Sequence, residues 1–411
     1  MKTYLVGGAV RDQLLKLPVK DRDWVVVGAN PEQMLAQKFV AVGKDFPVFL
    51  HPKSKEEYAL ARTERKSGKG YTGFECFSSP GVSVEEDLLR RDLTINAIAQ
   101  DEQGQLVDPY GGQDDLNARI LRHVSPAFRE DPLRILRVAR FAARFYHLGF
   151  RVADETMALM TQMTADDELQ YLAAERVWSE TQRALCTNTP SQFFEVLRHC
   201  GALAKLFPEI DDLFGVPQPE VHHPEIDTGL HTMMSLKLAA ELTPSPVVRF
   251  AVLTHDVGKG STPQDEWPRH IAHEEKGGVL IDALSKRLRV PSDYSKLAKR
   301  VAVYHTYCHR ALELKPATMV KTLEKLQAYR QPEKLEDFLI ACEADARGRK
   351  GFEERVYPQA QRFRDALHAS YQVDTQALVK AGYAGKQLGE AVHQERVRAV
   401  KQLGEQYDSA K

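Results

Sequence analysis

Residues 5–12 read Leu-Val-Gly-Gly-Ala-Val-Arg-Asp, and residues 21–28 read Asp-Arg-Asp-Trp-Val-Val-Val-Gly. The first segment predicts a short apolar strand that runs through a glycine pair into the start of a helix. Glycines at such a junction let backbone N–H groups approach a phosphate, and Arg11 adds a planar, permanently charged guanidinium. The junction therefore indicates phosphate binding, although a glycine pair after a strand is more often only a turn.

The second segment predicts a strand, because its three consecutive valines are β-branched and end at Gly28. Side chains alternate along a strand, so we expect Asp21 and Asp23 on the same face. Adjacent carboxylates repel each other unless a cation lies between them, and Mg²⁺ prefers oxygen ligands. A solvated strand edge is the alternative for this pair alone. Together, the two segments favour chemistry on a nucleoside triphosphate.

Composition limits the class of protein. The chain has 411 residues, 43% of them hydrophobic, which predicts two or three domains with a sizeable core. The formal net charge is −1, so a nucleic-acid site must be a local patch. The five cysteines are scattered, no long apolar segment occurs and no signal peptide is apparent. We therefore expect a cytoplasmic protein that does not cross a membrane.

Residues 1–120 alternate between strand and helix patterns. Segments 48–51 and 57–61 predict paired strands, and apolar spacing over residues 87–99 predicts a helix packed on the sheet. Arg91 and Asp92 would then lie near the site or form a surface ion pair. Residues 62–73 are basic and glycine-rich, and they are interpreted equally well as an exposed loop or as a loop that contacts RNA or nucleotide phosphates.

Arginine dominates residues 119–151, where the only acidic residues are Glu130 and Asp131. Helical spacing predicts one stripe made of Asp131, Arg134, Arg137, Arg140 and Arg144. A solvated face normally mixes lysine and glutamate, so a nearly pure arginine stripe favours bidentate recognition of phosphates or bases.

The second half of the chain is rich in histidine, after residues 215–228, which are interpreted as a linker. His231 is predicted on a helix over residues 229–242, the pair His255-Asp256 follows an apolar run, and Asp345 comes later. Imidazole and carboxylate ligands suit a transition metal or Zn²⁺ better than Mg²⁺. The alternative is that these residues only pack the helices. Residues after 350 predict polar helices without a motif.

These motifs together resemble the class II tRNA nucleotidyltransferases, the CCA-adding enzymes of the polymerase-β-like superfamily, over roughly residues 1–210. The second unit resembles the HD phosphohydrolases, and the fusion resembles the bacterial multifunctional CCA family. The resemblance implies an α+β nucleotidyltransferase head, an all-α neck and body and an all-α HD domain. The expected boundaries are 1–120 for the head, 121–215 for the neck and body, 228–350 for the HD domain and 351–411 for a helical tail.

The resemblance also implies a role for each site residue. In the head, Asp21 and Asp23 would hold Mg²⁺, and Gly8 and Arg11 would hold the phosphates. Arg91 and Asp92 would face the ribose. Asp131 and Arg134 would pair with the base, and Arg137 and Arg140 would line the same pocket. In the HD domain, His231, His255, Asp256 and Asp345 would hold Ni²⁺ or another divalent transition metal, with catalysis assigned to His255 and Asp256. The implied partners are tRNA, CTP and ATP, and the implied assembly is a monomer or homodimer.

The implied role of Asp131 and Arg134 in recognising the base agrees with simple hydrogen-bond chemistry. Cytosine and adenine each present an amine donor beside a ring-nitrogen acceptor, which a carboxylate and a guanidinium satisfy. Guanine and uracil reverse this pattern and would leave buried polar groups unpaired, at about 1–3 kcal/mol each. Two other functions remain open: a bacterial poly(A) polymerase, which shares the head motifs, and a non-catalytic RNA-binding protein, against which the presence of both aspartates argues.

Overall fold

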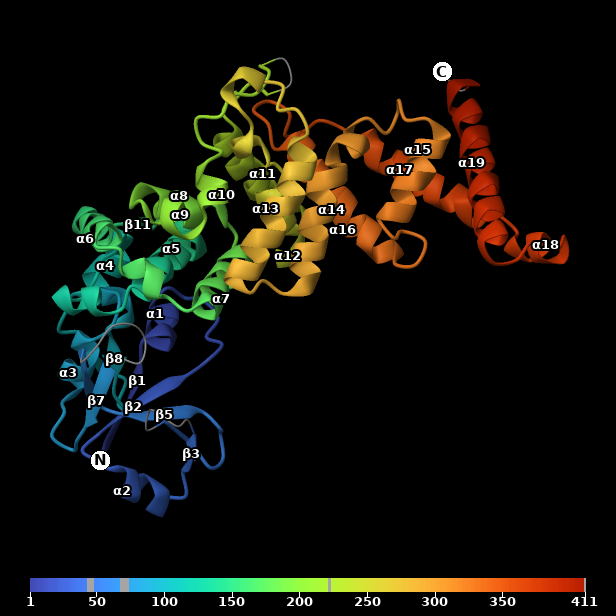
Figure 1. Cartoon of the computed structure of the whole chain (residues 1–411). Coiled ribbons are helices and arrows are strands. Elements are labelled where there is room, and N and C mark those ends of the chain that lie inside the picture. Colours follow the sequence, from blue (N-terminus) through green and yellow to red (C-terminus); the bar gives the residue numbers. More distant parts are fainter. Residues whose placement is uncertain (43–47, 67–73, 221–222, 410–411) are drawn as a thin grey trace. The chain divides into compact units, whose positions relative to one another are not determined.

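The computed structural model describes residues 1–42, 48–66, 74–220 and 223–409 (Figure 1). The chain divides into two compact units, each described here by itself. The first comprises Met1–Ala184 and Gln192–Leu206, and the second comprises Leu185–Ser191 and Phe207–Lys411.

The first unit is built on a seven-stranded sheet in the order β3-β4-β5-β2-β1-β8-β9. Its strands are β1 (Lys2–Val6), β2 (Asp23–Val27), β3 (Val40–Val42), β4 (Val48–Leu50), β5 (Glu57–Leu60), β8 (Ala99–Gln100) and β9 (Leu106–Val107). Only β2 and β5 are parallel, and the other neighbours are antiparallel. The sheet, followed by helices, confirms the predicted α+β head, and the antiparallel pairing of β4 with β5 confirms the predicted strand pair.

The turn from β1 into α1 (Gly8–Leu14) requires glycine. Gly7 has a φ of 65°, a conformation that other L-residues rarely adopt. A Cβ atom at Gly7 would also lie 2.7 Å from Nη1 of Arg91. The valines of β2 alternate as a buried strand should: Val25 packs in the core cluster that contains Leu88, and Val26 packs in the cluster on the other side with Met34.

The single helix predicted over residues 87–99 is wrong. The helix α3 (Val84–Leu89) ends early, and a 3₁₀ turn at Thr94–Asn96 then leads into β8. Tertiary hydrogen bonds take the backbone groups that a longer helix would need, because the N–H of Leu93 donates to the Asp92 carboxylate and the N–H of Thr94 donates to the carbonyl of Arg122. The apolar spacing is therefore shared between a short helix, a turn and a strand.

The basic segment over residues 62–73 is also not entirely a loop. Its first part forms β6 (Arg62–Lys66), which pairs antiparallel with β7 (Phe74–Ser78). Residues 67–73 lie outside the described part of the chain. The remaining elements of the first unit are α2 (Pro31–Ala36), α4 (Gly112–Ala118), β10 (Ile120–Leu121), α5 (Leu133–Phe145), β11 (Arg151–Val152), α6 (Asp154–Ala165), α7 (Ala174–Leu185), α8 (Ser191–His199) and α9 (Ala202–Leu206).

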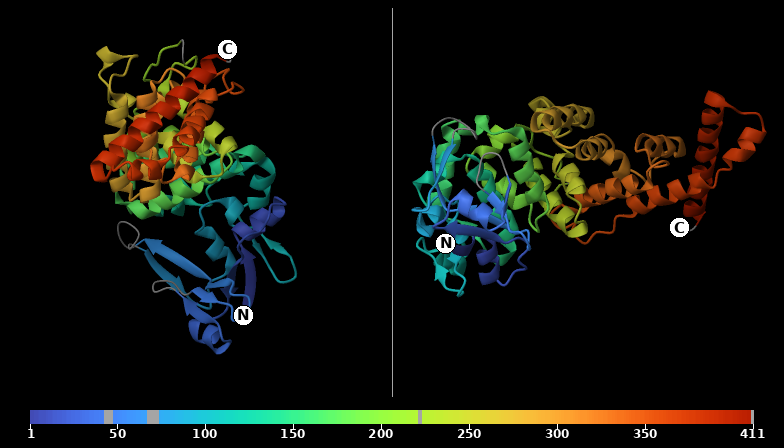
Figure 2. Two further views of the ribbon diagram at one scale, coloured as in Figure 1. Left: turned by 90° about the vertical axis from the view of Figure 1, so that its right-hand side faces the viewer. Right: turned by 90° about the horizontal axis from the view of Figure 1, so that it is seen from below.

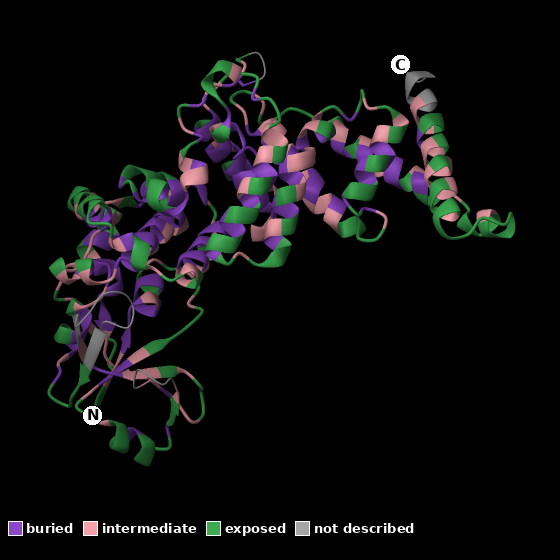
Figure 3. Cartoon of the chain, in the orientation of Figure 1, coloured by how far each residue is buried: buried purple, intermediate pink, exposed green. Residues whose placement is uncertain are grey.

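The second unit is helical throughout its described elements. Its helices are α10 (Pro208–Asp211), α11 (Thr228–Leu242), α12 (Pro246–Thr254), α13 (His273–Leu288), α14 (Ser292–His309), α15 (Pro316–Lys325), α16 (Pro332–Arg347), α17 (Pro358–Tyr371), α18 (Thr375–Lys380) and α19 (Gly385–Ser409). Helices α11, α12, α14 and α16 pack against one another, and α19 lies against α15 and α17 (Figures 1 and 2). Buried residues run along α14 and α16 (Figure 3). None of the described helices is both long enough and apolar enough to cross a membrane.

Candidate functional sites

One cavity of about 460 Å³ in the first unit collects the predicted nucleotide-binding residues. The predicted site residues among its lining are Gly8, Arg11, Asp23, Arg91, Asp92, Asp131, Arg134, Arg137 and Arg140. They come from α1, from the start of β2, from the turn after α3 and from the segment that contains α5. Asp21 lines a neighbouring cavity of about 570 Å³, which Asp23 also lines. The arrangement provides a cavity in which arginines outnumber the three aspartates.

The two aspartates are close, although not in the predicted way. Strand β2 begins at Asp23, so Asp21 lies before the strand and not within it as predicted, although both aspartates line the same cavity. Partial burial raises the pKa of Asp23, the positive charge of Arg91 lowers it, and the negative charge of Asp21 raises it again, with a net increase. Two neighbouring carboxylates that disfavour each other's charge fit a hard divalent cation such as Mg²⁺.

Arg11 is held in place before any ligand binds. It is buried, its Nε donates to Oδ1 of Asp12 at 2.8 Å, and its Nη1 donates to Oδ1 of Asn96 at 2.5 Å. Its guanidinium carbon lies 5.1 Å and 5.0 Å from the ring centres of Phe141 and Phe145. Such a fixed cation beside the glycine turn suits phosphate binding.

A buried aspartate that the sequence analysis missed positions the next two arginines. Asp87 is fully buried on α3, and it pairs with Nη2 of Arg90 at 2.7 Å and with Nη2 of Arg91 at 3.2 Å. Its spacing of three and four residues from these arginines, which directly follow α3, is the signal that could have revealed it. Arg91 in turn donates to the carbonyl of Asn96 at 3.4 Å.

The helical part of the arginine stripe begins at Arg134, and not at Asp131 as predicted. Helix α5 starts at Leu133, and Asp131 lies before it with an extended backbone. The Asp131 carboxylate accepts the N–H of Leu133 at 3.0 Å and also Nη2 of Arg176, on α7, at 3.1 Å. Arg134 is buried and donates to the carbonyls of Ala127 and Arg90. Asp131 and Arg134 both line the cavity, but the protein already binds part of each side chain.

The rest of the stripe is fixed by acidic partners. Arg140 Nε donates to Oε2 of Glu180 at 2.5 Å, and Arg144 Nη2 donates to Oδ2 of Asp12 at 2.8 Å. Glu180 and Arg176 lie four residues apart on α7, so this helix contacts two members of the stripe, Arg140 and Asp131. The sequence analysis missed both residues, and their helical spacing was the available signal.

The second unit brings three predicted metal ligands together in its core. His231 on α11, His255 directly after α12 and Asp345 on α16 are all buried, and one ligand atom of each lies within 4.8 Å of the others. His231 Nε2 is 3.1 Å from Oδ1 of Asp345, and His255 Nε2 is 3.6 Å from the same oxygen. These residues are separated in sequence, and the packing of three helical segments makes them neighbours.

Asp256, the fourth predicted ligand, belongs to an adjacent group. Its Oδ1 lies 3.6 Å from Nε2 of His273, at the start of α13, and 3.6 Å from Nε2 of His305 on α14. Asp256 Oδ1 and His273 Nε2 are buried and make no hydrogen bond within the part of the chain that is described. The other oxygen of Asp256, Oδ2, accepts a hydrogen bond from Nζ of Lys259 at 2.7 Å. A buried carboxylate oxygen and imidazole nitrogen that lack hydrogen-bond partners are atoms that can bind a metal cation.

The segment predicted as a linker also contributes to this region. Glu225 Oε1 lies 3.1 Å from Nδ1 of both His223 and His231. A carboxylate behind a metal-binding histidine fixes the orientation of its ring, so Glu225 suits that role. Burial lowers the pKa of His223 to about 4. Proline and histidine content suggested a connector, and nothing in the local pattern placed Glu225 beside His231.

The charges in this core favour a cation. Burial by itself lowers the pKa of His255, but the carboxylates of Asp256 and Asp345 raise it, with a net value of about 9. Burial lowers the pKa of His305 to about 3 despite the same two carboxylates. Two buried carboxylates therefore attract positive charge to the centre of the cluster, and the mixed imidazole and carboxylate donors suit a divalent transition metal.

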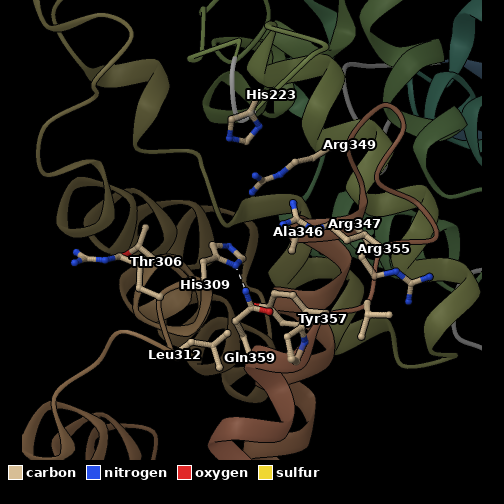
Figure 4. A pocket seen from close by; sticks show the side chains of 13 residues that line it. His223, Thr306, His309, Leu312, Ala346, Arg347, Arg349, Arg355, Tyr357 and Gln359 are labelled. Carbon is tan, nitrogen blue, oxygen red and sulfur yellow. Dashed lines mark hydrogen bonds between the residues drawn. The ribbon is translucent and has the colours of Figure 1, made fainter. Parts of the chain in front are cut away.

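A cavity of about 760 Å³, lined by side chains of the second unit, adjoins this cluster (Figure 4). Two of its lining residues touch Asp345: His309 Nε2 lies 2.6 Å from Oδ2, and Arg349 Nη2 lies 3.3 Å from Oδ1. We call it the α14–α16 cavity, because the C-terminal parts of those helices form much of its wall. It gives a ligand access to the neighbourhood of the metal-ligand group.

Comparison with known proteins yields matches along the chain. Family models match for the poly A polymerase head domain over residues 3–122, the probable RNA and SrmB-binding site of polymerase A over residues 149–214 and the HD domain over residues 228–346. The chain is 61% identical to the multifunctional CCA protein of Thioalkalivibrio sulfidiphilus, covering 98% of each chain. It is 60% identical to that of Vibrio cholerae, covering 98% of this chain and all of the other.

Solved structures show the same fold at low sequence identity. A CCA-adding enzyme in its apo form II matches 99% of this chain and 92% of its own, with a TM-score of 0.65 and 18% identity. The Thermotoga maritima CCA-adding enzyme complexed with tRNA matches 97% of this chain and 87% of its own, with a TM-score of 0.63 and 18% identity.

Proposed function

Because the chain belongs to the family of multifunctional CCA proteins, we propose that its first unit adds and repairs the 3′-terminal CCA of tRNA. It uses CTP and ATP, releases diphosphate and requires Mg²⁺. The observation that carries this proposal is the arginine-lined cavity, which joins the predicted phosphate, ribose and base residues to Asp23. Solved CCA-adding enzymes of the same fold bound to tRNA, ATP and CTP support the choice of partners.

The residues of the cavity divide the work in this proposal. Asp21 and Asp23 hold Mg²⁺, which neutralises the triphosphate and activates the RNA 3′-hydroxyl. The glycine turn at Gly8 and the fixed guanidinium of Arg11 bind the phosphates. Arg91 and Asp92 face the ribose. The fixed positions of these side chains reduce the reorganisation needed when a nucleotide binds.

Base selection rests on Asp131 and Arg134, with Arg137 and Arg140 lining the same cavity. The carboxylate accepts the amine of cytosine or adenine, and the guanidinium donates to the adjacent ring nitrogen. Arg176 supports the arrangement by holding one oxygen of Asp131. GTP and UTP would set donor against donor and acceptor against acceptor, which accounts for their rejection.

One assay tests this function. Purified protein is given tRNA that lacks its 3′ end, together with each labelled nucleotide separately and in pairs. We expect incorporation of C and then A that stops after CCA, with no use of GTP or UTP. Unlimited incorporation of ATP alone would instead identify a poly(A) polymerase, the function suggested by the name of the head-domain family.

We propose that the second unit is a metal-dependent phosphohydrolase that acts on 2′-phosphate, 2′,3′-cyclic phosphate or simple phosphomonoester ends. The buried group of His231, His255 and Asp345, with Asp256 beside it, supports this proposal. These residues would hold Ni²⁺ or another divalent transition metal, which would activate water for hydrolysis. In the reaction, the water oxygen bonds to phosphorus, the bond from phosphorus to the ribose oxygen breaks, and that oxygen gains a proton.

Two variants test the second activity. His255→Ala and Asp256→Ala are assayed for phosphohydrolysis with added Ni²⁺, Co²⁺, Mn²⁺ or Mg²⁺, and for nucleotide addition. We expect both to lose phosphohydrolysis and to keep nucleotide addition. His368→Ala, which changes an exposed histidine on α17, is the matched control. Loss of both activities, or of neither, contradicts the assignment.

The proposal includes a cytoplasmic location, which agrees with the four described cysteines, all of which are free thiols. The proposed assembly is a monomer or a homodimer.

A further inference from the structure

The α14–α16 cavity is larger than a phosphate group needs. Its volume of about 760 Å³ lies within the range of pockets that hold whole small-molecule ligands, about 300–1,000 Å³. His309 and Arg349 contact Asp345. Other parts of the wall come from the segment between α16 and α17, including Arg355 and Tyr357 (Figure 4). A phosphoester bound at the cluster would therefore leave room in the cavity for the rest of its molecule.

The four arginines of the cavity differ in their partners. Arg347 pairs with Glu343 at 2.6 Å, Arg349 with Asp345 at 3.3 Å and Arg310 with Glu313 at 3.5 Å. Arg355 is exposed, its guanidinium carbon lies 5.2 Å from the ring centre of Phe352, and it pairs with no carboxylate of the described residues. Arg355 is thus the cation of this cavity whose charge remains for an anionic group of a ligand.

The cavity wall also includes apolar side chains that are exposed to solvent. Leu312 and Val356, which both line it, are 61% and 81% exposed. The ring of Tyr357 forms another part of the wall, and its hydroxyl is held 2.9 Å from Nδ1 of His309. Apolar side chains of this kind, beside a cation and a fixed aromatic ring, suit a nucleobase attached to a charged backbone.

We propose that the α14–α16 cavity binds the terminal nucleoside of an RNA 3′ end together with the phosphodiester that precedes it. Arg355 contacts that phosphodiester, and Leu312 and Val356 contact the base. Arg355 is therefore a specificity-determining residue, which favours an oligonucleotide end over a mononucleotide or a small phosphomonoester. This inference rests on the proposed phosphohydrolase function and adds the substrate class that its cavity selects.

The test compares three substrates of increasing size with the full-length enzyme: p-nitrophenyl phosphate, adenosine 2′,3′-cyclic phosphate and the dinucleotide ApA that ends in a 2′,3′-cyclic phosphate. For Arg355→Gln, we expect kcat/KM on the dinucleotide to fall about tenfold through KM, as for the loss of one charge-assisted hydrogen bond. The values for the two smaller substrates should not change. Leu312→Ser should raise KM for both nucleotide substrates and leave p-nitrophenyl phosphate unaffected. Arg330→Gln, at an exposed position outside the cavity, is the control.

A binding measurement gives a readout that does not depend on activity. Fluorescence anisotropy follows the 5′-labelled dinucleotide on EDTA-treated protein, where metal-dependent turnover is absent. We expect Arg355→Gln, but not Arg330→Gln, to raise Kd about tenfold. Equal binding by wild type and Arg355→Gln would overturn the inference. If wild type hydrolyses no phosphoester with any metal, the proposed function fails, and the binding result still decides whether the cavity holds an RNA end.

Discussion

Arg137 Nε donates a hydrogen bond to Oδ2 of Asp92 at 2.7 Å, and this joins α5 to the turn that follows α3. The same carboxylate accepts the N–H of Leu93 and the side-chain amide of Asn96, each at 2.9 Å. A buried charge with three donors is compensated, so it holds the wall of the nucleotide cavity in one arrangement. Asp92 and Arg137, which were predicted to contact different parts of the nucleotide, therefore also bind each other.

Asp92→Asn should lower the free energy of unfolding of the first unit by about 1–3 kcal/mol, because it weakens bonds to a buried carboxylate. Burial alone raises the pKa of Asp92, but Arg137 and Asn96 lower it well below its usual value. The carboxylate therefore contributes fully above its unfolded pKa of about 3.9, and this stability is lost as pH falls through the lower, folded value. Thermal denaturation from pH 3 to 7 should show the difference between wild type and variant shrinking at acid pH. A difference that is constant with pH would contradict this account.

Asp21→Ala and Asp23→Ala should each reduce nucleotide addition by more than about 100-fold, since each removes a carboxylate proposed to hold Mg²⁺. Asp21 precedes β2 and Asp23 is its first residue, so neither lies in the sheet interior and the fold should remain intact. Incorporation of labelled CTP, with circular dichroism as the check on folding, measures both effects. Asp114→Ala, which changes an exposed aspartate on α4, serves as the matched control. Activity like that of wild type in either variant would disprove the two-carboxylate assignment.

Asp131→Ala and Arg134→Ala should reduce the use of CTP and ATP and increase relative use of UTP or GTP by about 10-fold or more, because unpaired groups no longer penalise the wrong base. Single-turnover incorporation of each nucleotide measures the selectivity. Arg134 also bonds to two backbone carbonyls, so the melting temperature of Arg134→Ala is measured alongside. Unchanged selectivity in both variants would show that other groups recognise the base.

Gly258→Ala should destabilise the second unit by about 1–3 kcal/mol, because there is no space for a Cβ atom. That atom would lie 1.9 Å from the carbonyl oxygen of His273 and 2.6 Å from the nitrogen of Gly277. The start of α13 must then move, and His273 moves with it, so affinity for Ni²⁺ should fall about 10-fold. Thermal denaturation and calorimetric titration with Ni²⁺ measure these effects. Gly389→Ala on α19, where a Cβ meets nothing within 4 Å, should be neutral or stabilising by up to about 1 kcal/mol. Equal behaviour of the two variants would refute the steric argument.

Several features follow from local sequence patterns, because their causes act over a few residues. Glycine at position 7 sets the turn after β1, alternating valines make β2 a buried strand, and arginines three or four residues apart form a stripe on α5. The resemblance to a known family extended these patterns to roles for single residues, and those roles stay proposals.

Other features depend on contacts between distant segments, which local spacing does not encode. The apolar pattern over residues 87–99 fits a helix, but the bond from Thr94 to the Arg122 carbonyl ends it early. Asp131 is matched with Arg176, and Asp256 with His273 and His305, because the packing of separate helices brings those side chains together. The sequence alone determined which residue types are available and, on β2 and α5, which faces they occupy. Only the tertiary structure decided their partners, because hydrogen bonds and charge compensation depend on distances that chain separation does not fix.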